Sequence, residues 1–354
     1  MMRTRPTTVK LLALLSAGAT LALTACASSG SSGASGAGAS GSGKNIVIAF
    51  SQAFSSNSWQ AANDKSAQTA ANALTSEGKI SKYLFTDADN NVTTQVSQIN
   101  SLILQHPSVI LIDPSSSTGL NGVIAKAVHA GIKILVFTDG PVTSKLPYEL
   151  EAPLAQYNQQ LAQYIVDRLH GKGNVLNVRG VAGTGADQAE ESGTAAAFKA
   201  APGIKVVGTV YGDWDEATAE SAVARILPGL PKIDAVMQQG GSGYGVAEAF
   251  KAAGRPAPLI VEGNRGEELK WWAQQHAASG YTTESIDPNP GMGASAVYIG
   301  YALATGQRVP KKNMIMPNLA ITQATLGQFS SLTTGQVAYK IYDQAWTEKN
   351  VIGG

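Results

Sequence analysis

Two tryptophans stand in short polar loops, each following an apolar, strand-like run and preceding a helix-like run. Trp214 lies in GDWDEA and Trp59 in SNSWQ. A tryptophan ring suits the apolar C–H face of a pyranose or furanose, while nearby polar groups meet the hydroxyls. We therefore expect both rings to contact a ligand. The alternatives are a core position for Trp214, and for Trp59 a purely structural helix start in which Asn57 and Gln60 form a cap pair.

Asp139 directly follows the apolar run ILVFT. A carboxylate can accept two hydroxyl hydrogens at once, and charge-assisted hydrogen bonds are worth about 1.5–3 kcal/mol each when buried. We expect Asp139 to bind ligand hydroxyls. The alternative is a solvated turn aspartate in TDGP.

Residue patterns typical of enzymes, metal sites and phosphate loops are missing from the sequence. The Gly-rich QQGGSGYG matches neither GxGxxG nor GxxxxGK[ST], and Tyr244 prevents a GxSxG elbow at Ser242. The four histidines have no HExxH-like spacing, and Cys26 is the single cysteine. We therefore expect a protein that is not an enzyme and that uses no metal and no cofactor.

Strand-like and helix-like runs alternate from Lys44 onward. The first, Ile46 to Trp59, reads as strand, loop and helix start. Other strand-like runs begin at Tyr83, Val109 and Lys133, and then at Asn174, Lys205, Asp234, Pro258 and Tyr281. This order predicts two similar α/β halves in tandem, each a parallel sheet with helices on both faces. The polar loops after the strands should then meet at a cleft.

The N-terminal residues read as a secretion signal. Basic residues precede an apolar segment from Leu11 to Ala25, which is shorter than the ~20 residues of a spanning helix. Leu23-Thr24-Ala25-Cys26 resembles the lipobox of bacterial lipoproteins, so 1–25 is the expected signal peptide and Cys26 the lipidation site. A buried cysteine is the alternative. Residues 26–43, nearly all Gly, Ala and Ser, are the expected flexible tether.

The charge balance gives no sign of a nucleic-acid partner. The chain has 26 basic and 25 acidic residues, and no Lys or Arg run marks a binding arm. The expected contact with a membrane is through the lipid anchor only.

From Lys44 onward the chain resembles the ribose- and galactofuranose-type sugar-binding proteins of bacterial ABC importers, the periplasmic binding proteins of type 1. The resemblance is carried by FSQAFSSNSW, DADNNVTTQVSQINSLI, VILIDPSSSTGLNGVIAKAVHAGIKILVFTDGP, GKGNVLNVRGVAGTGAD, GDWDEA, DAVMQQGGSGYGVAEAFKAAG and GNRGEELKWW. It implies two doubly wound parallel-sheet lobes joined by a three-segment hinge. The implied ranges are 44–151 plus 286–313 for the first lobe and 152–285 plus 314–354 for the second.

The resemblance also implies a ligand site and partners. The implied contacts come from both lobes and the hinge: Phe54, Asn57, Trp59, Gln60, Asp139, Glu190, Trp214, Gln239, Asn264, Ser285 and Asp287. The implied protein is an extracytoplasmic monomer, lipid-anchored to the cell membrane, that delivers a sugar or polyol to an ABC permease and ATPase. A sugar-sensing receptor that signals to a sensor kinase or chemoreceptor is the alternative.

Some residues depart from the family pattern. Relatives often have arginine where this chain has Gln60, Gly140 and Glu190, and the ribose-binding type has aspartate at the position of Gly240. Losing cationic donors while gaining a carboxylate argues against ribose or galactofuranose. We expect a different sugar, a polyol or an amino sugar.

Overall fold

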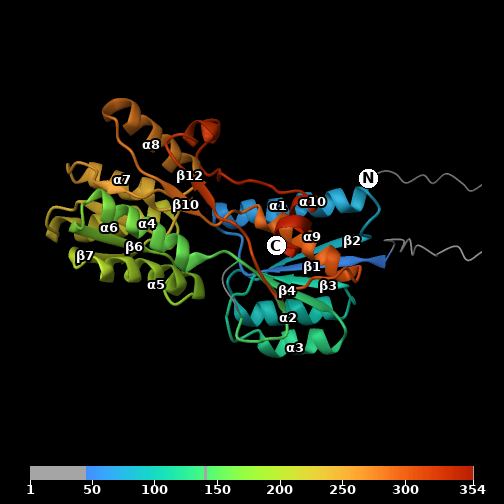
Figure 1. Cartoon of the computed structure of the whole chain (residues 1–354). Coiled ribbons are helices and arrows are strands. Elements are labelled where there is room, and N and C mark those ends of the chain that lie inside the picture. The colour runs from blue at the N-terminus through green and yellow to red at the C-terminus, as the bar shows by residue number, and fades with distance from the viewer. Residues whose placement is uncertain (1–44, 139–141, 354) are drawn as a thin grey trace, which may run out of the picture. The chain divides into compact units, whose positions relative to one another are not determined.

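The computed structural model describes residues 45–138 and 142–353, which form two α/β lobes (Figure 1). The first lobe is built on a six-stranded sheet with the order β11-β5-β4-β3-β1-β2, and the second on a four-stranded sheet with the order β7-β6-β8-β9. All neighbours in both sheets pair in parallel. Parallel order places the carboxyl ends of the strands, and the loops that follow them, at one edge of each sheet.

The elements of the first lobe are β1 (Val47–Gln52), α1 (Ser58–Ser76), β2 (Lys82–Asp87), α2 (Val92–Ile103), β3 (Val109–Ile112), α3 (Asn121–His129), β4 (Lys133–Phe137), β5 (Tyr148–Glu151), α9 (Met292–Ala304) and β11 (Asn313–Ile315). Its core has two layers because strand side chains alternate between the faces of the sheet. Ile48 and Phe50 pack against α1 and α9. Ala49 and Ile110 pack against α2 and α3 on the other face (Figure 1).

The elements of the second lobe are α4 (Leu154–Arg168), β6 (Lys172–Arg179), α5 (Gly185–Ala200), β7 (Gly203–Tyr211), α6 (Glu216–Ile226), β8 (Ala235–Gln238), α7 (Gly243–Ala252), β9 (Leu259–Ile260) and α8 (Gly266–Ser279). Leu176 and Val178 pack against α6, α7 and α8. Val175 and Met237 pack against α4 and α5. Trp271 and Trp272 on α8 belong to this core.

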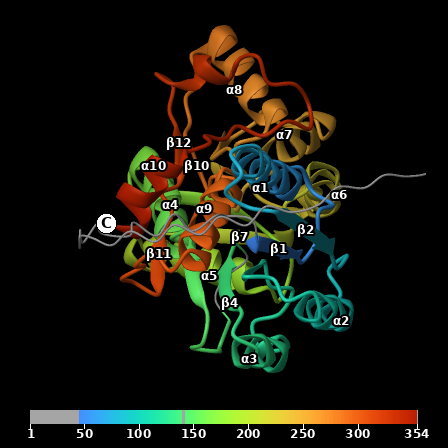
Figure 2. The same cartoon turned by 90° about the vertical axis from the view of Figure 1, so that its right-hand side faces the viewer.

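A separate two-stranded antiparallel sheet pairs β10 (Ser285–Asp287) with β12 (Leu319–Ile321), and both views show these strands side by side (Figures 1 and 2). The last strand-like run of the sequence was expected from Tyr281 in the second-lobe sheet. That prediction is wrong, because the segment does not form a strand of that sheet. Its one backbone bridge toward the second-lobe sheet is an isolated parallel bridge between Ser285 and Glu262. The strand β5 was not predicted, since its four residues lie between two prolines.

The C-terminal segment differs from the expected lobe ranges. Ile321 and Ala338 pack in the second-lobe core, as expected for 314–354. However, the chain then crosses once more, through α10 (Gln344–Thr347) to a π-helical turn (Glu348–Ile352), and Val351 and Ile352 pack in the first-lobe core. Assigning all of 314–354 to the second lobe was therefore wrong for its last part, where apolar side chains complete the face covered by α9.

No helix within the described ranges is both long and apolar enough to span a membrane. The same residues contain no grouping of three His, Cys, Asp or Glu side chains suited to a metal ion. The expected signal peptide, tether and Cys26 lie outside the described residues.

Candidate functional site

A cavity lies between the two lobes and takes side chains from each. Its volume, counting only positions open to the centre of a water molecule, is about 70 Å³. This is several times the roughly 10–15 Å³ that a single water needs, so the cavity has room for polar groups of a ligand. The lining residues are Phe54, Asn57, Trp59, Gln60, Thr138, Leu154, Tyr157, Ala186, Glu190, Trp214, Gln239, Gly240, Asn264, Arg265, Asp287, Pro288 and Met292.

A wider cleft shares Phe54, Asn57 and Trp214 with this cavity, and its volume by the same measure is about 610 Å³. Its other walls are loops that follow strands of both lobes, including 114–117 and 181–185. The cleft therefore offers a path from the solvent to the cavity.

The first-lobe wall of the cavity is formed by the loop between β1 and α1 and by the first turn of α1. Asn57 caps the helix, since its Oδ1 accepts the Gln60 N–H at 2.8 Å. The side chain of Gln60 is buried and accepts a hydrogen bond from Gln52 Nε2 at 3.0 Å. Trp59 lines the cavity while its Nε1 donates to the Pro288 carbonyl at 2.8 Å. The capping role and the position in the cavity wall thus coexist in this loop.

Trp214 is held in place by its backbone and by close packing. Asp213 and Trp214 have φ of 56° and 53°, a left-handed conformation that is unusual for a bulky side chain and typical of functional loops. The indole lies directly on the Gly180 backbone, where any Cβ would overlap it. Asp215 then caps α6 by accepting the Thr218 N–H at 2.8 Å.

Glu190 lies on α5 and is 3% exposed. Its carboxyl accepts hydrogen bonds from the hydroxyl of Tyr157 on α4 and from Trp214 Nε1, the latter at 3.3 Å. Burial raises the pKa of Glu190 well above its ordinary value, although these hydrogen bonds act to lower it. The site therefore contains a buried acid whose two observed donors are neutral.

The two amide residues of the second-lobe wall also support neighbouring loops. Gln239 Oε1 accepts the Gly180 N–H at 2.6 Å, and Gln239 Nε2 donates to the Asp187 carbonyl at 3.2 Å. Asn264 Nδ2 donates to the Ala338 carbonyl at 3.3 Å. These bonds fix the amides before any ligand binds, which favours specific recognition.

Asp287 reaches the cavity from β10. Its Oδ2 accepts a hydrogen bond from Ser285 Oγ at 3.2 Å, and burial raises its pKa to about 7. A Cβ at Gly240, where φ is 93°, would lie 2.5 Å from Asp287 Oδ1. Gly240 therefore leaves the space that this carboxyl fills.

The structure brings almost all of the predicted site residues to one cavity. Ser285 is the exception among those described, because it lies behind Asp287 and lines no part of the cavity. Asp139 lies outside the described residues, although its neighbour Thr138 is in the wall. Their contact with a ligand stays a prediction.

Sequence reasoning missed Tyr157 and Arg265. Tyr157 sits within a regular helical pattern that carries no sign of a site. Arg265 starts α8, and its guanidinium donates from Nε to Ser58 Oγ at 2.8 Å and from Nη2 to the Trp214 carbonyl at 2.7 Å. Ser58 belongs to the first lobe and Arg265 to the second, so this arginine links the two lobes beside the cavity. The sequence indicated Arg265 only through its position in GNRGEELKWW, one of the segments that carry the family resemblance.

Comparison with known proteins agrees with this architecture. Residues 48–308 match the family model described as periplasmic binding protein domain. A solved structure, an ABC transporter solute binding protein from Thermobispora bispora, is 32% identical with a TM-score of 0.80, and the match covers 87% of this chain and 95% of that one.

Curated relatives align over a smaller part. The xylitol-binding protein of Mycolicibacterium smegmatis is 29% identical over 182 residues, which are 51% of this chain and 52% of the relative. The ribose import binding protein of Bacillus subtilis is 24% identical over 52% of this chain and 60% of the relative. The matched segment thus spans between half and two thirds of these relatives.

Proposed function

Because this chain belongs to the periplasmic binding protein domain family, we propose that it is an extracytoplasmic solute-binding protein for an ABC importer. It holds a sugar or a sugar-like polyol between its lobes and delivers it to a membrane permease with its ATPase. Closure around the ligand is a hinge motion, favoured because the ligand contacts both lobes.

The observation that carries the proposal is the composition of the cavity wall. Trp59 from the first lobe and Trp214 from the second supply aromatic surface, and buried amide and carboxyl groups surround them. Apolar faces combined with a few fixed polar groups are what a polyhydroxy ligand requires.

The departures from the ribose-binding pattern support a ligand other than ribose or galactofuranose. Asp287 occupies the space that Gly240 leaves open, and Glu190 places a carboxyl where the family resemblance implies an arginine. The similarity to a protein named for xylitol supports the inclusion of polyols.

We further propose that the mature protein begins at Cys26 and is anchored through lipid on that residue. Mass spectrometry of the N-terminal peptide tests this. A diacylglyceryl-modified Cys26 is expected, and Cys26→Ala should release the protein from the membrane. An unmodified Cys26 in membrane-associated protein would contradict the anchor.

A thermal-shift screen of pentoses, hexoses, furanose sugars and polyols tests ligand capture. The expected result is a rise in Tm with one ligand class other than ribose or galactofuranose, lost in Trp214→Ala. The matched control is Trp346→Ala, since Trp346 stacks on Tyr342 in the first lobe, outside the cavity. This control should keep the ligand-induced shift even if its own Tm is lower, and the largest shift with ribose would show that the substitutions do not alter the ligand class.

A further inference from the structure

The buried carboxyl of Glu190 has no cationic partner among the described residues. Its two hydrogen-bond donors, Tyr157 and Trp214, are neutral, and no ion pair within the described ranges involves it. Burying an ionised acid without a counter-charge destabilises the folded protein. The loss of hydration costs several kcal/mol, and hydrogen bonds from neutral donors offset this cost only in part. Glu190 lines the ligand cavity, so a ligand can supply what the protein lacks.

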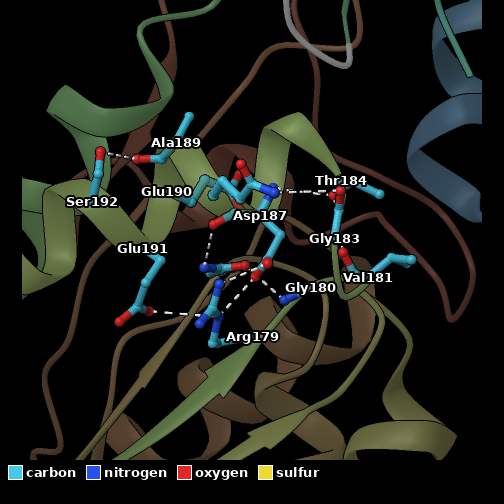
Figure 3. Close-up of polar contacts among 12 residues, drawn as sticks. Arg179, Gly180, Val181, Gly183, Thr184, Asp187, Ala189, Glu190, Glu191 and Ser192 are labelled. Carbon is cyan, nitrogen blue, oxygen red and sulfur yellow. Dashed lines mark hydrogen bonds and ion pairs between the residues drawn. The ribbon is translucent and has the colours of Figure 1, made fainter. Parts of the chain in front are cut away.

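The neighbouring acid, Glu191, shows the contrast. Its carboxylate lies 3.7 Å from Arg179 Nε and accepts a hydrogen bond from Asn177 at 2.9 Å. Figure 3 shows Glu191 turned toward Arg179, with Glu190 taking no part in that ion pair. The same arginine also pairs with Asp187, from Nη2 to Oδ2 at 2.7 Å. Arg179 is therefore already committed to two other acids of α5.

The one basic residue in the described cavity wall is also committed. Arg265 uses Nε and Nη2 for Ser58 and the Trp214 carbonyl. Its charge lowers the pKa of Asp287, whereas the charged groups that act on Glu190 are the acids Asp287 and Asp187. Arg265 thus serves the Asp287 side of the cavity, and among the residues described here Glu190 faces neutral donors and like charges.

We propose that the ligand is an amine-bearing sugar or polyol whose ammonium group binds at Glu190. This inference rests on the proposed function and names the ligand class of the same site. The ammonium would donate to the carboxylate and cancel its charge, forming a buried ion pair in which Tyr157 and Trp214 satisfy further lone pairs. The hydroxyls of the ligand would then be met by the fixed amides and by Asp287.

A neutral sugar makes poorer use of this arrangement. It would leave the carboxyl either ionised with neutral donors alone or protonated, and glutamine at position 190 would serve as well without the cost of a buried acid.

Matched pairs of probes test the inference on the full-length protein. Each pair differs in one group: D-glucosamine and D-glucose, D-galactosamine and D-galactose, 1-amino-1-deoxy-D-sorbitol and D-sorbitol. Calorimetry at pH 7.5 should show at least tenfold tighter binding of the amine in the pair that binds. Tighter or equal binding of every neutral member would overturn the inference and leave the proposed function standing, whereas no binding by any member, or by the wider sugar screen, would reject both.

Two variants assign the effect to the carboxylate. Glu190→Gln keeps the size and an acceptor for Tyr157 or Trp214 and should reduce the amine preference, which is the ratio of the two affinities within a pair, at least tenfold. Glu191→Gln removes the same charge one residue along the helix, outside the cavity, and should leave the preference unchanged. An equal loss in both variants, or none in Glu190→Gln, would contradict a direct role for Glu190.

The pH dependence gives a further readout that a purely structural role would not produce. The ion pair needs an ionised Glu190, so lowering the pH from 7.5 to 5 should weaken binding of the amine. The titratable and charged groups around Glu190 are Tyr157 on α4, Asp187 on α5, Asp287 on β10 and Arg265 at the start of α8. Asp287 also titrates in this range, so the decisive measurement is the change in amine affinity between pH 7.5 and pH 5 in the wild type and in Glu190→Gln. The change should be smaller in the variant. A change of the same size in both proteins would refute the role of Glu190 as the partner of the ammonium group.

Discussion

Replacing Asp287 by asparagine should make the protein more stable, and the gain should grow with pH. The folded state holds this carboxyl in a buried position, and its pKa rises from an ordinary 3.8 to about 7. The folded protein therefore binds a proton more tightly than the unfolded chain between these values. It follows that wild-type stability falls as the pH rises through that window.

The size of the effect follows from the two pKa values. A separation of about 3 pH units, at about 1.36 kcal/mol each, amounts to about 4 kcal/mol of unfolding free energy at pH 7 and above, and about half of that near pH 5.5. An asparagine side chain has no charge to desolvate, so Asp287→Asn escapes this loss. The weaker hydrogen bond to Ser285 adds an offset that does not depend on pH.

Urea unfolding at pH 4.5, 5.5, 6.5 and 7.5, followed by tryptophan fluorescence, measures the difference between variant and wild type. Ser285→Ala provides a second test, because Ser285 donates to the carboxylate and lowers its pKa. Without this donor the pKa should rise further, and the loss of stability should continue to higher pH than in the wild type. The difference in unfolding free energy between Asp287→Asn and the wild type should therefore change with pH. If it stays constant from pH 4.5 to 7.5, burial of this carboxyl does not control the pH dependence of stability.

Two further predictions concern packing and closure. Gly193→Ala should lower the free energy of unfolding by about 1–3 kcal/mol, because a Cβ there would overlap the Ala155 carbonyl on α4. This clash with the backbone outweighs the roughly 1 kcal/mol that alanine gains over glycine in helix propensity. Gly122→Ala on α3 is the control, since a Cβ there meets nothing within 4 Å, and it should be neutral or stabilising in the same urea assay; equal effects would contradict the packing argument. Ser58→Ala removes the acceptor of Arg265 across the lobes and, at about 1.5–3 kcal/mol for a charge-assisted bond, should weaken ligand binding roughly ten- to hundredfold in calorimetry. Unchanged affinity would show that this link does not favour the closed state.

The sequence predicted the local elements well, because their signals are short in range. The strands expected to begin at Val109 and Lys133 do so in the structure, as β3 and β4, since each is a short apolar run that is buried in the sheet. The order of strands and helices was enough to predict two parallel-sheet lobes and a cleft at the strand ends. For the same reason the loops that carry Trp59 and Trp214 could be assigned to the site, because each directly follows a strand.

Features that depend on contacts between distant segments could not be predicted in this way. Tyr157 belongs to the site only because α4 packs on α5 and brings its hydroxyl to Glu190. Arg265 links the lobes only because the start of α8 lies opposite Ser58. The return of Val351 and Ile352 to the first lobe depends on the uncovered face beside α9.

The residues alone thus determined the fold class and the loops that face the ligand. The hydrophobic period and the order of strands and helices are local properties of the sequence and do not depend on contacts between distant segments. Tertiary structure decided the electrostatics of the site. Whether a carboxyl is buried, and whether a cation stands next to it, depends on which segments meet in space, and only there did Glu190 prove to be an acid without a counter-charge among the described residues.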